Sequence, residues 1–224
     1  MKPKRSTGRK LQEAAQAKPG TFRTVGRHLA LTQAVRPAQK PMFPLREGYR
    51  IEIYKDPELG LRMPVLTAAI SADKLFPVIF DLVKPLGEVV DFILESSHEI
   101  SAASEGAAVA NTWERTDIDL PVLTSILCDY EDLLLNDGCT GIAVLNADRD
   151  YEVHFDEHKL LYLYGPDLKQ FEAILQQHGI VREDDLIVVT EEEHIHSTSD
   201  EHYEQMQELR QVVGVEDEVE SASW

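Results

Sequence analysis

The chain has 224 residues, 43% hydrophobic and 28% charged, with a formal net charge of −18, a composition typical of one soluble globular domain with tails. No apolar run reaches the roughly 18 residues that span a bilayer, and no apolar core follows the basic residues at the start, so the sequence predicts no membrane partner and no secretory signal. The two cysteines are too few for a disulfide framework, and we therefore expect a reduced, cytoplasmic location.

Residues 1–46 form a basic arm that we predict to be disordered. Residues 1–50 hold 12 of the 22 Lys and Arg residues and only two acids, Glu13 and Glu47, which leaves 10 basic and 38 acidic residues in 51–224. The apolar residues of the arm are too scattered to offset the entropy of ordering. Three interpretations stay open: a solvated tail, an arm that contacts nucleic-acid phosphates, and an organelle transit peptide.

The predicted globular domain covers residues 47–213 and begins with two strands and a helix. Apolar and polar residues alternate over 49–54, which predicts a half-buried strand, and 65–70 predicts a second strand after a turn. Residues 71–83 predict a helix with a capping residue at its start, although Pro77 lies within it.

The middle of the domain predicts a strand, a long loop and a helix. The apolar run 89–94 indicates a buried strand. Residues 95–117 are small and polar without periodicity, and a loop of this length is commonly functional or mobile. Leucines at spacings of three and four predict a helix over 119–138, closed by Gly138 in the left-handed conformation, and we expect Cys128 and Cys139 to be buried.

The last part predicts a meander followed by alternating helices and a strand. Strands over 140–145, 151–155 and 159–164 are joined by short turns, which indicates antiparallel pairing. The remaining predictions are helices over 167–178 and 199–213, a buried strand over 186–189 and an acidic flexible tail over 214–224. The predicted fold class is therefore α/β of the mixed α+β kind: one mixed sheet with an antiparallel meander, flanked by about four helices, with disordered tails.

Two histidines after the strand at 186–189 are suited to metal binding. In extended chain His194 and His196 point to the same side, and this pair is half of a metal site. The following Thr198 or Ser199 is explained by capping of the final helix, on which we expect His202 to face water.

A complete site needs ligands from another segment. If strands 89–94 and 186–189 are parallel neighbours, their polar carboxyl ends lie at one edge of the sheet. We therefore hypothesise a site for one divalent metal such as Zn, formed by Glu95, His98, His194 and His196. The alternative is that both segments are ordinary polar loops without a cofactor.

A second polar group occurs in the meander. The alternation over 151–155 predicts a strand with one wet face, and the segment does not contain the HExxH pattern of zinc proteases. A catalytic role for His154, Asp156 or His158 is an alternative that only their spacing supports.

The charge distribution favours a soluble, non-catalytic interaction or regulatory protein. Its acidic body suits a basic protein partner, for instance through Asp129, Glu131 and Asp132, and disfavours nucleic acid, for which only the basic arm is suited. The alternative is a metal-dependent hydrolase in which Glu95 or Glu193 is a ligand or base and the loop over 96–117 is a lid.

Overall fold

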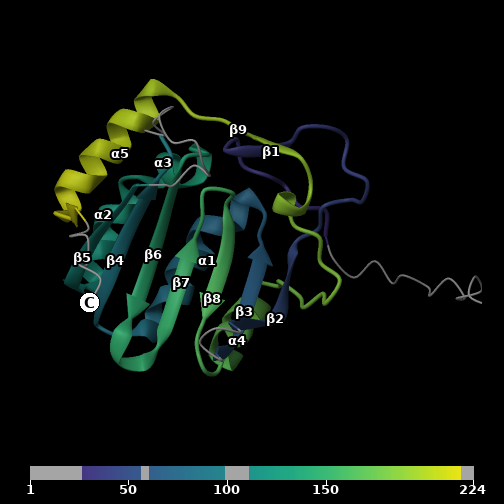
Figure 1. The fold of residues 1–224 in the computed structure, drawn as a ribbon, viewed down its shortest axis with the longest axis horizontal. Coiled ribbons are helices and arrows are strands. Elements are labelled where there is room, and N and C mark those ends of the chain that lie inside the picture. The colour runs from purple at the N-terminus through teal and green to yellow at the C-terminus, as the bar shows by residue number, and fades with distance from the viewer. Residues whose placement is uncertain (1–26, 57–60, 99–110, 218–224) are drawn as a thin grey trace, which may run out of the picture.

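Eight strands form one antiparallel sheet in the computed structural model, which describes residues 27–56, 61–98 and 111–217. Their order across the sheet is β10-β5-β4-β6-β7-β8-β3-β2, with the meander β6-β7-β8 at the centre (Figure 1). The strands are β2 (Gly48–Asp56), β3 (Leu61–Ala69), β4 (Val89–Ser96), β5 (Asn111–Asp119), β6 (Thr140–Asn146), β7 (Tyr151–Phe155), β8 (Leu160–Tyr164) and β10 (Glu216–Asp217).

Helices pack against one face of this sheet, and α1 and α4 lie behind it in Figure 1. Alternate residues of the strands, such as Phe92 and Leu94 of β4 and Phe155 of β7, join the helices in one large apolar core. The helices are α1 (Ala72–Val83), α2 (Leu120–Cys128), α3 (Glu131–Asn136), α4 (Lys169–Gln177) and α5 (Asp200–Val213).

The opposite face of the sheet carries polar and aromatic side chains, and we call it the open face. It presents Glu95 of β4, Glu152 and His154 of β7, and Tyr162 and Tyr164 of β8, all of them half-buried. One face of the sheet therefore packs on the core and the other is more accessible to solvent, as is common in antiparallel sheets.

A two-stranded ribbon lies beyond one end of the sheet. It pairs β1 (Val35–Pro37) with β9 (His194–His196) in antiparallel register. A second apolar cluster holds the ribbon region to the body and includes Leu29, Leu45 and Val188. Residues 27–46 of the predicted arm thus belong to the packed structure, and the rest of the arm, 1–26, lies outside the described residues.

The predicted mixed α+β class is confirmed, while the expectation of parallel pairs is wrong, because every described strand pair is antiparallel. The segment 186–189 does not join the sheet. Its apolar residues Leu186, Val188 and Val189 are buried in the second cluster instead.

Two predictions in the middle of the domain also need correction. The end of the predicted loop is strand β5, which shows little apolar alternation because only Trp113 and Ile118 of its nine residues are buried; residues 99–110 lie outside the described part. The predicted helix 119–138 breaks at Asp129 and Tyr130, which allows α2 and α3 each to present leucines to the core. Cys128 is exposed and Cys139 is half-buried, so the expectation that both are buried is wrong.

A three-histidine cluster as a candidate metal centre

The β1-β9 ribbon fixes the direction of two histidines. His196 lies opposite Val35 and His194 opposite Pro37, and the backbone N–H of Ser197 donates to the carbonyl of Ala34 at 2.7 Å. His194 and His196 are half-buried, whereas Ile195 between them is 41% exposed. The alternation places both imidazoles on the inner side of the ribbon.

The turn between β7 and β8 supplies a third histidine. Asp156 holds this turn, because its carboxylate accepts from the backbone N–H of Leu160 at 2.9 Å and its carbonyl accepts from Lys159 N–H at 3.0 Å. Lys159 takes a left-handed conformation with φ of 63°. His158 therefore stands at the tip of the hairpin, at the end of the sheet that faces the ribbon.

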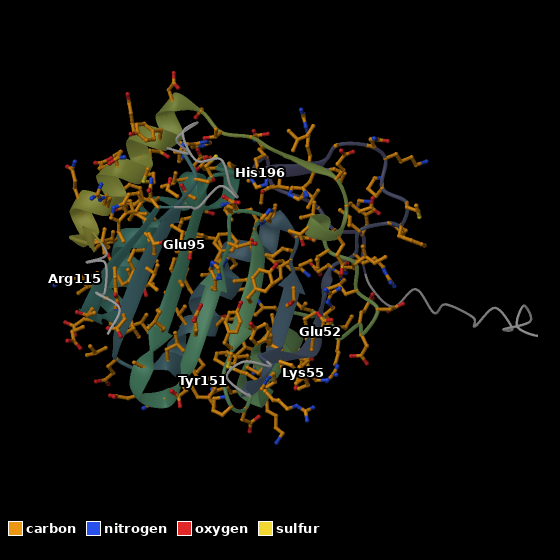
Figure 2. All side chains as sticks on the ribbon, viewed as in Figure 1. Glu52, Lys55, Glu95, Arg115, Tyr151 and His196 are labelled. Atoms are coloured by element: carbon orange, nitrogen blue, oxygen red, sulfur yellow. The ribbon has the colours of Figure 1, made fainter. Side chains whose placement is uncertain are left out.

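These three imidazoles form one cluster. One ring nitrogen of each of His158, His194 and His196 lies within 4.8 Å of the other two. The ring centroid of His158 is 4.9 Å from that of His194 and 4.7 Å from that of His196. Figure 2 shows His196 beyond the upper end of the sheet, with Glu95 on the sheet below it. The cluster thus joins the hairpin tip to the ribbon.

Nδ1 of each histidine is engaged by an oxygen acceptor. Nδ1 of His158 lies 2.8 Å from the Asp156 carboxylate, Nδ1 of His194 lies 2.8 Å from the Glu192 carbonyl, and Nδ1 of His196 donates to the Gly138 carbonyl. A carbonyl only accepts, so Nδ1 carries the proton in His194 and His196. Nε2 is then the nitrogen with a free lone pair, which is the form that binds a metal.

Gly138 is required where the α3–β6 connection meets the ribbon. A Cβ atom at this position would lie 2.4 Å from the Ala34 carbonyl oxygen and 3.0 Å from backbone atoms of Ser197. The prediction that Gly138 closes a helix in the left-handed conformation is wrong, since its φ is not positive. The glycine instead permits the close backbone approach that brings its carbonyl to His196.

A pocket of about 170 Å³ adjoins the cluster, and His158 lines it. Its carboxylates are Glu95, Asp156 and Glu157, and the Ser97 hydroxyl donates to Glu157 at 2.6 Å. Burial opposes protonation of His158, but its hydrogen bond to Asp156 and the charges of Asp156 and Glu157 prevail and raise its pKa. The surroundings therefore favour positive charge at this site.

The structure places the two other predicted ligands, Glu95 and His98, outside the three-histidine cluster. Glu95 lies on the open face, 3.0 Å from Nε2 of His154, and His98 lies 2.8 Å from the carboxylate of Asp137. Among the described residues, β4 pairs only with β5 and β6, both antiparallel, so the parallel strands needed to unite Glu95 and His98 with the His194 pair do not form there. His158 takes part in their place.

Of the candidate residues in the meander, His154 belongs to the open face. Burial opposes its protonation, but the hydrogen bond to Glu95 and the charges of Glu95, Asp156 and Glu152 raise its pKa. Burial also raises the pKa of Glu152, and the nearby Glu95 acts in the same direction. Asp156 holds the turn and the ring of His158.

Lys159 is buried behind the cluster. Its Nζ donates to the Thr140 carbonyl at 2.8 Å and lies 5.1 Å from the centre of the Phe155 ring. Burial lowers the pKa of Lys159 to about 8, although Asp137, Asp156 and Glu157 oppose this shift. Its side chain packs the hairpin against β6.

Comparisons with known proteins do not identify a family. No family model matches this chain, and no curated protein and no solved structure matches it. Among the helices of the described ranges, none is at once long and apolar enough to cross a membrane.

Proposed function

We propose that this protein binds a divalent transition-metal ion, with zinc as the first expectation, through Nε2 of His158, His194 and His196, and that it uses the metal for hydrolysis. The observation that carries the proposal is the hydrogen bond that each Nδ1 makes to an oxygen atom. Histidines that bind metals almost always hold their second nitrogen in this way, since the bond fixes the tautomer and the ring.

Three imidazoles are also the protein ligands of one well-known kind of catalytic zinc site. Such a site keeps its fourth position for water and lowers the pKa of that water to about 7. Sites that serve only structure usually supply all four ligands from the protein. The three-histidine set therefore favours metal-activated water over a purely structural ion.

Carboxylates near the cluster supply bases for this chemistry. Glu95 is held by His154 at 3.0 Å and Glu157 by the Ser97 hydroxyl at 2.6 Å, and both line the pocket beside His158. A carboxylate held in this way can accept a proton from metal-bound water. Glu193 is less suited to the role, because it is exposed and faces Gln39.

Metal analysis of tag-free protein tests the proposal. We expect bound zinc in the wild type, and we expect the His194→Ala/His196→Ala variant and the His158→Ala variant each to lose about one equivalent of metal. His178→Ala is the matched control. His178 pairs with Asp81 on the helical side, away from the cluster, so this variant should retain its metal. Unchanged metal content in both cluster variants would overturn the proposal. A screen of ester, amide and phosphoester substrates with the metal-loaded protein then tests hydrolysis.

A second candidate function is the binding of a basic protein partner. It is favoured by the charge of residues 51–224, which hold 10 basic and 38 acidic residues, and by the exposure of Asp129, Glu131 and Asp132 on the helical side. Such a surface steers basic partners through long-range attraction. Pull-downs with and without residues 1–26, which leave strand β1 in place, at low and high salt test it; capture that does not weaken with salt contradicts an electrostatic surface.

A further inference from the structure

A second group of metal-binding side chains lies beside the three-histidine cluster. His98, Asp137 and Cys139 each present one ligand atom, and these atoms lie within 4.8 Å of one another. They come from the end of β4 and from the α3–β6 connection. Gly138 lies between Asp137 and Cys139 and accepts from His196, so three consecutive residues connect this second group to the first cluster.

Asp137 is the centre of the second group. Its side chain is 0% exposed, and its Oδ2 accepts from Nε2 of His98 at 2.8 Å and from the Thr140 hydroxyl at 2.6 Å. Burial opposes ionisation of Asp137, but the hydrogen bonds from His98, Thr140 and Thr198 and the charge of His98 prevail and lower its pKa. These neighbours therefore favour the ionised form of the carboxylate.

The second oxygen of this carboxylate lacks a well-formed hydrogen bond. Within the described residues, Oδ1 of Asp137 and Nδ1 of His202 are both buried polar atoms without a partner of normal geometry, and they lie 4.0 Å apart. His202 is not the water-facing residue that the sequence predicts, because its side chain is only 15% exposed. Two buried polar atoms that face each other across such a gap suit an intervening cation.

We propose that His98, Asp137 and Cys139 bind a second divalent transition-metal ion, with His202 as the fourth ligand. Imidazole, carboxylate and thiolate donors are the ligand set that zinc and cobalt accept in tetrahedral sites. Binding of the ion would release two protons to solvent: the proton shared by His98 and Asp137, and the proton of the Cys139 thiol. This site is distinct from the three-histidine cluster and does not depend on the function proposed for it.

The surrounding contacts orient these ligands. The Thr140 hydroxyl holds Asp137, and the backbone N–H of Ser97 donates to the Cys139 carbonyl at 2.9 Å. Four protein ligands leave no coordination position for water, so the second ion would stabilise the fold rather than activate a nucleophile. It ties the end of β4 and helix α5 to the α3–β6 connection that supports His196.

Cobalt substitution of the full-length protein tests this inference. A cobalt ion bound by thiolate gives a charge-transfer band in the near ultraviolet, which imidazole ligands alone do not produce. We expect this band in the wild type, with about two cobalt ions per chain. Cys139→Ser should lose the band and about half of the cobalt, whereas Cys128→Ser, at the exposed cysteine, should retain both. His194→Ala/His196→Ala should lose the other ion and keep the band.

The outcomes separate the two sites. Loss of the band in Cys139→Ser alone supports the second site even if the three-histidine cluster binds nothing. Absence of the band from cobalt-loaded wild type, or its persistence in Cys139→Ser, overturns the second site. If Cys139→Ser does not fold, thiol labelling of the wild type decides: cobalt must slow labelling of Cys139 at least tenfold and leave Cys128 unchanged, and equal labelling rates with and without cobalt overturn the inference.

Discussion

Nδ1 of His196 donates to the carbonyl oxygen of Gly138, and this bond joins the β1-β9 ribbon to the connection between α3 and β6. The two residues are far apart in the sequence. Their contact exists because the backbone at Gly138 also forms a hydrogen bond between its own N–H and the Ser197 carbonyl at 2.8 Å. The orientation of a candidate metal ligand thus depends on a glycine that itself holds no metal.

Replacing Gly138 by alanine should weaken both the fold and the metal site. The new Cβ would lie 2.4 Å from the Ala34 carbonyl oxygen. This oxygen belongs to the backbone, so it cannot move away by a change of side-chain rotamer. Overpacking of this kind costs about 2 kcal/mol of unfolding free energy. Urea denaturation and zinc titration of Gly138→Ala measure the two effects.

Gly179→Ala is the control for that variant. Gly179 has a φ of 73°, and a Cβ atom there would have no heavy atom within 4 Å, so alanine is strained at this position but meets nothing. We expect a stability loss of about 1 kcal/mol and an unchanged zinc affinity. Equal zinc affinity in Gly138→Ala and Gly179→Ala would show that the Gly138 contact does not support the site.

Asp156 should tune the affinity of the three-histidine cluster without binding the metal. Its carboxylate holds Nδ1 of His158 at 2.8 Å, and loss of such a partner lowers metal affinity roughly 10-fold to 100-fold. Asp156→Ala should show this loss in a competition titration with a chromophoric chelator. Asp81→Ala, which removes the partner of His178, is the matched control and should leave the affinity unchanged; equal losses in both variants contradict the role of Asp156.

The parts of the site that depend on local pattern were predictable. Alternation along extended chain is enough to place His194 and His196 on one side, and the short turn between two apolar strands is enough to predict the hairpin that carries His158. The meeting of hairpin and ribbon was not predictable in this way. It depends on one buried apolar cluster that contains Leu29, Val35 and Val188, and no periodicity of the sequence relates the segments that supply them.

The errors have physical causes of the same kind. The apolar run at 186–189 resembles a strand because a buried irregular segment needs the same residues as a buried strand. That error implied a parallel partner for β4 and so assembled Glu95 and His98 with the wrong residues. Strand β5 resembles a loop because seven of its nine residues lie outside the core, as is common near the edge of a sheet.

The pair formed by His154 and Glu95 should make stability depend on pH. The pKa of His154 is raised in the folded protein above its ordinary value of 6.5, so protonated His154 stabilises the fold. This contribution is complete below the unfolded pKa and is lost as the pH rises through the higher folded pKa. The two side chains are 20% and 33% exposed, and solvent limits the contribution to about 1 kcal/mol.

Urea denaturation of wild type and His154→Asn at about pH 5.5 and about pH 9 measures this dependence. The variant should be less stable than the wild type by about 1 kcal/mol at the lower pH and by a smaller amount at the higher pH. Glu95→Gln should reproduce the pattern, because it removes the charge that raises the pKa of His154. If the difference in unfolding free energy between wild type and His154→Asn grows as the pH rises, the predicted stabilisation by protonated His154 is contradicted.

The two cysteines should differ in reactivity even without metal. Cys128 is exposed, whereas burial raises the pKa of the half-buried Cys139. The hydrogen bond to Ser97 opposes this shift, and the charges of Asp137 and Glu157 add to it. Thiolate is the reactive form, so Cys139 should react with a disulfide reagent at least about tenfold more slowly than Cys128. Stopped-flow labelling of metal-free protein should show one fast and one slow thiol, and Cys128→Ser should remove the fast phase alone. If the fast phase persists in that variant, Cys139 is a reactive thiol, and the burial that isolates it from solvent is not maintained in solution.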